Sequence, residues 1–362
     1  MLTLLTTVLI FLISLAVVMS AAAWFTRRLE VLCDRLDFSP GVLSALSALG
    51  ANIPNYVASI DALARAQTDV GLGIIIGSNI YNVAIILGIA TFAAPGRAGI
   101  HMQSAESRDA RTVGSYAVMV MLSTLLLVWL LPGMPVARAN TPALFGSVLP
   151  VFIPLVSLSL FTALMLHIAR RSHVPHAQKE EQDAQTSQTR TPDAHQERFY
   201  ISPDPSTPFH GGSFSLIRLG AEIVLALVLA LIGVIAMVQS GQTVTIDLHM
   251  PGLLAGLLVL AVATSLPNTV VVVILARTGR AVTCIEEIFS SNSINAALGI
   301  ALPLLFWRAA QVDRLLRILD APLMVALVLA VLLCVWSGKL SRVGGVLLLL
   351  SYAGWVAVHL WW

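Results

Sequence analysis

The chain has 362 residues, of which 57% are hydrophobic and only 11% are Asp, Glu, Lys or Arg, and its mean hydropathy is +0.86. Because a soluble globular chain carries roughly 25% charged residues, this composition excludes a water-soluble enzyme and predicts a polytopic membrane protein. The net charge of +2 is small and dispersed, so it does not indicate a nucleic-acid partner, which requires a clustered basic face.

Apolar windows separated by polar breaks predict ten transmembrane helices, at roughly 20 residues for each crossing of the hydrocarbon core. In chain order we expect them at residues 2–24, 39–64, 70–94, 112–131, 143–168, 215–238, 252–276, 282–306, 321–337 and 343–361. The first window lacks the positive region of a secretory signal, and Arg27 and Arg28 follow it. We therefore expect it to be a transmembrane helix that is kept in the mature protein, with its N-terminus outside.

The distribution of basic residues predicts the orientation of these helices. With ten spans and an outside N-terminus, most of the 21 Lys and Arg residues fall in segments on the cytoplasmic side, as expected because basic loops resist translocation. The outer cluster of Arg308, Arg314 and Arg317 runs against this asymmetry, although Asp313 and Asp320 dilute it. We therefore expect an all-α integral protein of the plasma (inner) membrane with both termini outside.

A polar stretch rich in Gln, Ser, Thr, Pro and His separates the fifth and sixth windows. It predicts a disordered cytoplasmic linker at 169–214, between a first five-helix membrane repeat at 1–168 and a second at 215–362. The histidines of the linker are expected to be solvated, since nothing fixes their geometry as metal ligands. The three cysteines have no metal-ligand spacing and are expected to fill apolar space.

The two halves carry the same pattern at a fixed offset of 213 residues. Gly-Ala-Asn-Ile-Pro-Asn at 50–55 precedes Gly-Ser-Asn-Ile-Tyr-Asn at 77–82, and Ala-Thr-Ser-Leu-Pro-Asn at 263–268 precedes Ser-Ser-Asn-Ser-Ile-Asn at 290–295. The identical positions are Pro54/Pro267, Asn55/Asn268, Ser78/Ser291, Asn79/Asn292 and Asn82/Asn295. The predicted orientation makes the repeats inverted, which is typical of secondary transporters with broken helices and a site at the membrane midplane.

The residue types in these blocks suit a cation site. A proline inside a helix leaves the carbonyl four residues earlier unpaired, so Pro54 and Pro267 should free the carbonyls of Gly50 and Ala263 at a depth where a cation would satisfy them. The side chains predicted to complete the site are Asn52, Asn55, Ser78, Asn82, Thr264, Ser265, Asn268, Ser291 and Asn295. The alternative interpretation is that these small polar residues only glue helices together.

Acidic residues inside a membrane are functional candidates by default, and Glu287 is the best placed of four. It lies one helical turn before Ser291 on the same face and could restore negative charge to the pathway or carry a proton; alternatively, it reaches water at the cytoplasmic end of its helix. Glu286 is expected to be an interfacial carboxylate. Asp61 and Glu222 are expected at the membrane edges, in ion pairs with Arg65 and Arg218, each of which lies four residues away in the sequence.

The two blocks resemble the α-repeats of the calcium/cation antiporter superfamily, the membrane region of the sodium/calcium exchanger. Those repeats typically read G-T-S-x-P-E and then G-S-N-I-x-N, and residues 77–82 and 264–267 match closely. The resemblance implies five plus five inverted spans and alternating access, with the first and sixth helices sliding across the core. The motif glutamates are replaced by Asn55 and Asn268, and the often acidic later position is Asn295.

These replacements leave no carboxylate on the matched ligand set. Because calcium affinity depends on the charge of its ligands, the expected function is a cation antiporter with altered selectivity, in which a neutral cage suits a monovalent cation. The partners are the transported cations, with Na⁺ and Ca²⁺ as candidates, and the lipid bilayer; no cofactor and no enzyme activity are expected. The alternative is a non-transporting membrane sensor or accessory protein, whereas an intramembrane enzyme lacks a histidine base near Ser78 or Ser291.

Overall fold

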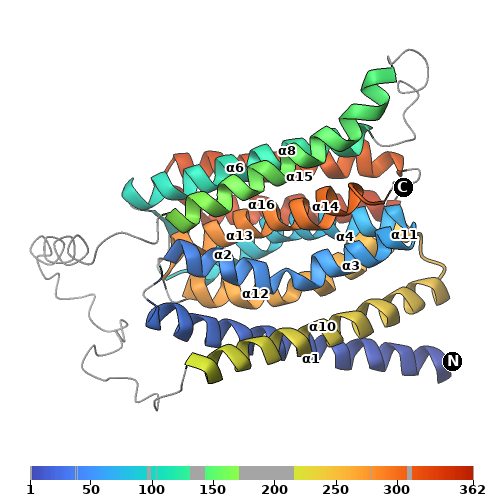
Figure 1. Ribbon diagram of the computed structural model, residues 1–362, viewed down its shortest axis with the longest axis horizontal. Helices are drawn as coiled ribbons and strands as arrows, with labels where there is room; N and C mark the ends of the chain where they lie inside the picture. Colours follow the sequence, from blue (N-terminus) through green and yellow to red (C-terminus); the bar gives the residue numbers. More distant parts are fainter. Residues whose placement is uncertain are drawn as a thin grey trace, which may run out of the picture.

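The computed structural model is a bundle of long helices lying side by side (Figure 1). The structure describes residues 2–36, 38, 40–95, 99–102, 104–130, 143–170, 216–277, 279–307 and 312–361. The predicted linker and its histidines lie outside these residues, except for the last two residues of α8.

Helix is present in every predicted window. The elements of the first half are α1 (Leu2–Arg35), α2 (Pro40–Ala51), α3 (Ile53–Ala64), α4 (Thr68–Tyr81), the π-helical η1 (Asn82–Leu87), α5 (Gly88–Ala93), α6 (Ser104–Leu130) and α8 (Ala143–Arg170). Those of the second half are α10 (Leu216–Asp247), α11 (Gly252–Leu254), η3 (Ala255–Leu260), α12 (Ala261–Arg277), α13 (Ala281–Ala296), η4 (Ala297–Ala301), α14 (Leu302–Leu304), η5 (Leu316–Asp320), α15 (Ala321–Trp336) and α16 (Arg342–Trp361).

Eight helical segments of the described chain are long and apolar enough to cross a membrane. The predicted windows at 39–64 and 282–306 are not among them. The first is divided into two twelve-residue helices, α2 and α3, and the second carries the acidic and amide residues of α13. These two windows carry half of the predicted cation-site residues, namely Asn52, Asn55, Glu287, Ser291 and Asn295.

Helices α1 and α10 are longer than predicted and pack against each other (Figure 1). They end at Arg35 and Asp247 rather than near residues 24 and 238. The extension of α1 is held to α10 by an ion pair of 2.6 Å between Arg28 Nε and Glu222 Oε2. The extension of α1 thus finds on α10 a partner for the charge of Arg28.

A short antiparallel strand pair departs from the all-α prediction. Strand β1 (Gly99–His101) follows α5, and β2 (Lys339–Ser341) follows α15, with Gly99 opposite Ser341. The backbone N–H and C=O groups of the two loops form hydrogen bonds with each other. This pairing joins the two halves of the chain at one end of the bundle.

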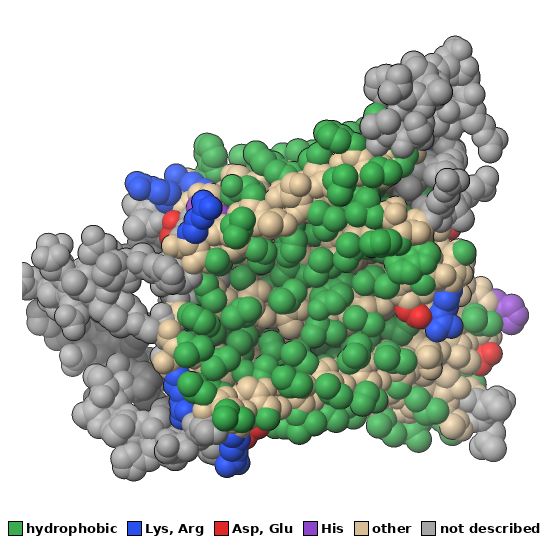
Figure 2. Space-filling view, viewed as in Figure 1, with side chains coloured by type: hydrophobic (Ala, Val, Ile, Leu, Met, Phe, Trp, Pro, Cys, Tyr) green, Lys and Arg blue, Asp and Glu red, His purple; other side chains and the backbone are tan. Residues whose placement is uncertain are grey.

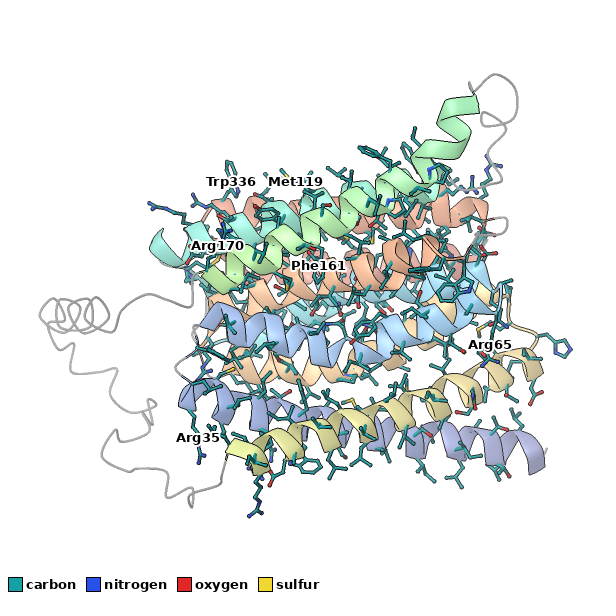
Figure 3. The ribbon with its side chains drawn as sticks, in the orientation of Figure 1. Arg35, Arg65, Met119, Phe161, Arg170 and Trp336 are labelled. Atoms are coloured by element: carbon teal, nitrogen blue, oxygen red, sulfur yellow. The ribbon has the colours of Figure 1, made fainter. Side chains whose placement is uncertain are left out.

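The surface of the bundle matches a protein that sits in lipid. Hydrophobic side chains cover the middle of the face shown in Figure 2, and Lys and Arg side chains lie towards its two ends. Arg35 and Arg170 are at one end and Arg65 is at the other (Figure 3), and both chain termini lie at the end of Arg65 (Figure 1). The termini therefore share one side of the bundle, as predicted.

Helix α4 is the buried centre of the bundle, with every residue from Gly71 to Tyr81 buried. Its glycines allow close approach to the second half: a Cβ added at Gly77 would lie 2.6 Å from the carbonyl oxygen of Leu257. Cys33 and Cys284 are buried, as expected for cysteines that fill apolar space, and Cys334 is partly exposed.

Replacing Gly77 by alanine is expected to lower stability in detergent by about 1–3 kcal/mol, because the added methyl group meets backbone that cannot move aside. Gly220→Ala on α10 is the matched control, since nothing lies within 4 Å of that position and alanine is the better helix former. Thermal unfolding of both variants checks this. Equal melting of Gly77→Ala and the unchanged protein would contradict the close packing of α4 against η3.

Candidate cation-binding site

The helix that carries the first motif breaks at Asn52, between α2 and α3. Pro54 lies in the first turn of α3, where its missing N–H is no loss. The backbone N–H groups of Asn55 and Tyr56 both bond to the Asn52 carbonyl, at 3.0 and 3.2 Å. The predicted break in the first half is confirmed.

The predicted break at Pro267 is wrong, because α12 is continuous from Ala261 to Arg277. A single proline removes only one backbone hydrogen bond, and the rest of the helix keeps its bonds because exposed backbone groups are costly at membrane depth. The hydroxyl of Thr264 also donates to the Leu260 carbonyl at 2.7 Å, which ties η3 to the start of α12. The two proline motifs therefore act differently on their helices.

Four asparagines, which we call the amide clasp, join α4 and η1 to α13: Asn79, Asn82, Asn292 and Asn295. Asn82 Nδ2 donates to Asn292 Oδ1 at 3.0 Å, and Asn295 Nδ2 donates to Asn79 Oδ1, also at 3.0 Å. Asn79 Nδ2 and Asn292 Nδ2 each donate to the backbone carbonyl of the other, at 3.4 and 3.2 Å. Each half contributes the same donors and acceptors, so the clasp has local two-fold symmetry.

Ser291 is the centre of a second group of hydrogen bonds. Its hydroxyl oxygen accepts from Asn52 Nδ2 at 2.7 Å and from Asn268 Nδ2 at 3.0 Å, and its hydroxyl donates to Glu287 Oε1 at 3.2 Å. Asn55 Nδ2 donates to Asn52 Oδ1 at 2.9 Å. The two motif asparagines at 55 and 268 are thus linked through Asn52 and Ser291.

All ten predicted site residues are fully buried. Four of them have an oxygen atom that lacks a hydrogen-bond partner: Asn55 Oδ1, Asn82 Oδ1, Ser265 Oγ and Glu287 Oε2. A buried polar atom without a partner costs about 1–3 kcal/mol, so these oxygens favour a ligand that accepts their lone pairs. A cation meets that requirement.

Two predicted ligands are only partly joined to this group. The hydroxyl of Ser78 donates to the Ala261 carbonyl at 3.3 Å and so links α4 to α12, whereas Thr264 bonds within its own helix segment. Among the described residues, no three His, Cys, Asp or Glu side chains are grouped to hold a metal ion. The site is therefore built from amides and hydroxyls, with one carboxylate at its edge.

The four acidic residues singled out in the sequence differ in their burial and in their partners. Glu287 is fully buried, which contradicts the alternative in which it reaches water. Glu286 is only 6% exposed, so its side chain is buried in the protein; its predicted interfacial position concerns depth in the membrane and stays a prediction. The predicted edge ion pairs are confirmed, at 3.0 Å each: Asp61 with Arg65, and Glu222 with Arg218.

Sequence reasoning left three polar residues out of the site. Asn79 and Asn292 form part of the amide clasp. The same residue type stands at this position in both repeats, and this repetition could have identified them from the sequence. Ser59 Oγ lies 2.8 Å from the Gly71 carbonyl and 2.7 Å from the Gly299 carbonyl, so one hydroxyl proton is shared between α4 and η4. No repeated pattern marked Ser59.

Matched π-helical turns follow the clasp in both halves. The turn η1 begins at Asn82, and η4 begins two residues after Asn295. Single π-helical turns inside α-helices are frequent at functional sites. Their shared position supports a functional role for the clasp region.

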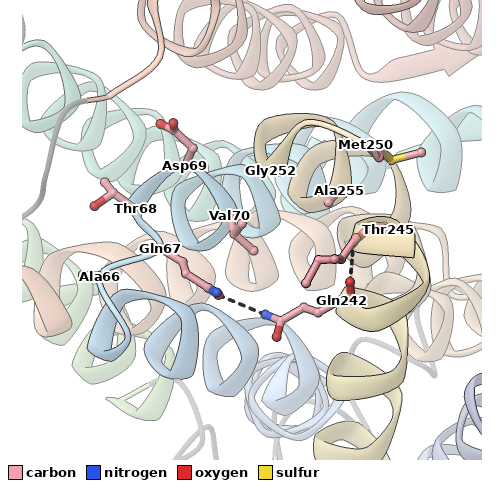
Figure 4. A pocket seen from close by; sticks show the side chains of 11 residues that line it. Ala66, Gln67, Thr68, Asp69, Val70, Gln242, Thr245, Met250, Gly252 and Ala255 are labelled. Carbon is pink, nitrogen blue, oxygen red and sulfur yellow. Dashed lines mark hydrogen bonds between the residues drawn. The ribbon is translucent and has the colours of Figure 1, made fainter. Parts of the chain in front are cut away.

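A pocket of about 480 Å³ opens at the end of the bundle that carries Arg65. It lies between the turn from α3 to α4 and the last turns of α10, and Gln242 Nε2 donates to Gln67 Oε1 across it at 3.3 Å (Figure 4). Asp69 and Thr245 also line it. The pocket has a mixed lining, in which Val70, Ile246 and Met250 accompany the polar side chains, and it adjoins α10 and α4.

The two side-chain hydrogen bonds of the amide clasp predict two equal coupling energies. In a double-mutant cycle, Asn79→Ala with Asn295→Ala should show a coupling energy of about 1 kcal/mol, and Asn292→Ala with Asn82→Ala should show the same value because the two bonds have equal length. Unfolding in detergent measures both. Asn79→Ala with Ser351→Ala, which is exposed on α16, is the additive control, and additivity in the first two cycles would refute the clasp.

A family model described as sodium/calcium exchanger protein matches residues 6–169 and 221–361. The sodium/calcium exchanger MaX1 of Methanosarcina acetivorans is 30% identical over 95 residues, which are 26% of this chain and 27% of that relative. The inner membrane protein YrbG of Escherichia coli is 24% identical over 353 residues, 96% of this chain and 95% of its own. The family match covers both halves, whereas the MaX1 match spans about a quarter of that relative.

Solved structures share the fold. The structure of the sodium-calcium exchanger NCX_Mj soaked with 10 mM Na⁺ and zero Ca²⁺ is similar to this chain with a TM-score of 0.65 and 17% identity, over 98% of this chain and 99% of that one. At this identity the likeness concerns the arrangement of the helices.

Proposed function

Since this chain belongs to the sodium/calcium exchanger protein family, we propose that it is a secondary active cation antiporter that works by alternating access. The observation that carries the proposal is the buried group around Ser291. There, Asn55 and Asn268, which stand at the motif positions of the two halves, are linked by hydrogen bonds and leave oxygens unpaired.

The proposed scaffold is ten transmembrane helices in two inverted five-helix repeats, at 1–168 and 215–362, joined by a cytoplasmic linker. Helix in every window, the reciprocal bonds of the amide clasp and the matched π-helical turns support it. The windows 39–64 and 282–306, which do not count as spans by helix length and apolar character, bury their polar site residues inside the bundle. A polar helix can cross the membrane there because its neighbours cover it.

The proposed ligand set is Asn52, Asn55, Ser78, Asn82, Thr264, Ser265, Asn268, Glu287, Ser291 and Asn295. Nine of these ten side chains are neutral. Divalent calcium gains affinity from charged ligands, so this set favours a monovalent cation and alters the selectivity relative to a site with paired glutamates.

The proposed moving unit is the pair of α1 and α10, which pack on each other and on the edge of the core. The ion pair between Arg28 and Glu222 links them, so they move together. The pocket between α10 and the turn before α4 is the proposed entrance from the side of the termini, and a shift of α10 would open or close it.

Cation exchange in vesicles tests the function. We expect proteoliposomes to exchange a labelled cation, drawn from Na⁺, K⁺, Ca²⁺ and Mg²⁺, and we expect Asn55→Ala and Asn268→Ala each to lower the flux at least tenfold because each removes a ligand oxygen. Ser351→Ala, exposed on α16, is the control and should retain full flux.

Flux unaffected by both asparagine changes would count against the site. No flux for any of these cations or for protons would instead support a sensor or accessory protein that keeps the exchanger scaffold. The two results are distinguishable, because only the second concerns the unchanged protein.

The topology has its own test. The termini share one end of the bundle, and the positive-inside rule places that end outside. An epitope tag at the C-terminus is therefore expected to bind antibody on intact cells, whereas a tag inserted at residue 190 should bind only after permeabilisation. The reverse pattern would invert the proposed orientation.

A further inference from the structure

The buried group is asymmetric at one position. At the fixed offset between the halves, the counterpart of Glu287 is Ile74, and both side chains are fully buried. The second half thus places a carboxylate where the first half places an alkyl group. Any cation held by Glu287 must lie on the side of the second half.

Glu287 has no ion-pair partner in the described chain, since the ion pairs there involve other acids. Its Oε1 accepts a hydrogen bond from Ser291 at 3.2 Å, and its Oε2 has no partner. An unpaired carboxylate away from water is costly by several kcal/mol. The position therefore calls for a positive charge, which either a bound cation or a proton on the carboxyl group supplies.

The amide clasp, which lies on the local two-fold axis, has few side-chain atoms left to bind a cation. The clasp amides bond to one another across the local two-fold axis, so much of their hydrogen-bonding capacity is used to hold α4 against α13. By contrast, Ser291 places its hydroxyl between the Glu287 carboxylate and the Asn268 carboxamide. Asn268 Oδ1 lies 3.5 Å from the Ser291 hydroxyl oxygen, so carboxylate, hydroxyl and amide oxygens meet there, on one turn of α13 and the facing turn of α12.

We propose that Glu287 is the specificity-determining residue of the cation site, and that it holds one monovalent cation beside Ser291 and Asn268, off the symmetry axis. This inference rests on the proposed antiport function. One negative side chain and one monovalent cation give a neutral buried site, whereas a divalent cation would leave a net positive charge in a medium of low dielectric constant. The clasp then mainly holds α4 and η1 against α13, and Asn82 Oδ1, which lacks a partner, is the oxygen it leaves for a ligand.

Cation-dependent thermal stability in detergent tests the proposal, since an ion that binds the folded state stabilises it by mass action. Na⁺, K⁺ and Ca²⁺ are compared at constant ionic strength with N-methylglucamine chloride. One of the monovalent cations should stabilise the unchanged protein at a lower concentration than Ca²⁺. Glu287→Gln should raise its half-maximal concentration at least tenfold, whereas the adjacent control Glu286→Gln should change it less than twofold.

A gain-of-charge variant tests the same idea where Glu287→Gln fails to fold. Asn268→Asp adds a second carboxylate next to Ser291 and should lower the half-maximal concentration of Ca²⁺ at least tenfold. The proposal is overturned if Glu287→Gln keeps the monovalent response, if Asn268→Asp leaves the Ca²⁺ response unchanged, or if Ca²⁺ is the better stabiliser of the unchanged protein.

Failure of this inference differs from failure of the proposed function. If vesicles exchange a cation and lose the exchange in Asn55→Ala, but Glu287→Gln behaves as the unchanged protein, the antiporter stands and only the role of Glu287 falls. If no cation stabilises the unchanged protein and none is exchanged, the proposed function falls with it.

Discussion

The structure depends on one constraint: polar side chains buried at membrane depth must satisfy one another, because no water or lipid does so. The chain buries a dense set of asparagines and serines in α2–α4, α12 and α13. Most find partners in the clasp or around Ser291. The atoms that do not, among them Asn55 Oδ1 and Glu287 Oε2, define where an ion would complete the arrangement.

Two neighbouring networks therefore divide the work of the buried centre. The clasp uses amides in reciprocal pairs, and among its side-chain oxygens in the described chain Asn82 Oδ1 lacks a partner. The group around Ser291 shares a single hydroxyl among Asn52, Asn268 and Glu287, and its acceptors exceed its donors. An excess of oxygen acceptors is the chemistry of a cation site, whereas a balanced set of amides is the chemistry of helix packing.

The sequence predicted the helices and the buried centre well where a pattern is repeated in the two halves. It predicted less well the positions where the outcome for a single residue depends on how its neighbours pack. The 213-residue offset pointed to Asn55, Asn268 and Ser291, all of which the structure brings together. It did not reveal that Pro54 begins a helix whereas Pro267 lies inside one, because that difference depends on the surrounding packing. Helix angle alone also gave no indication that Glu286 is buried in the protein.

The strand pair between Gly99–His101 and Lys339–Ser341 also limits how the molecule changes shape. Its register is fixed by backbone bonds, and a slip of one residue would turn every side chain to the opposite face. The loops after α5 and α15 are therefore fastened to each other at that end of the bundle. In the proposed alternating access, the helices tied by this strand pair would form the stationary frame against which α1 and α10 move.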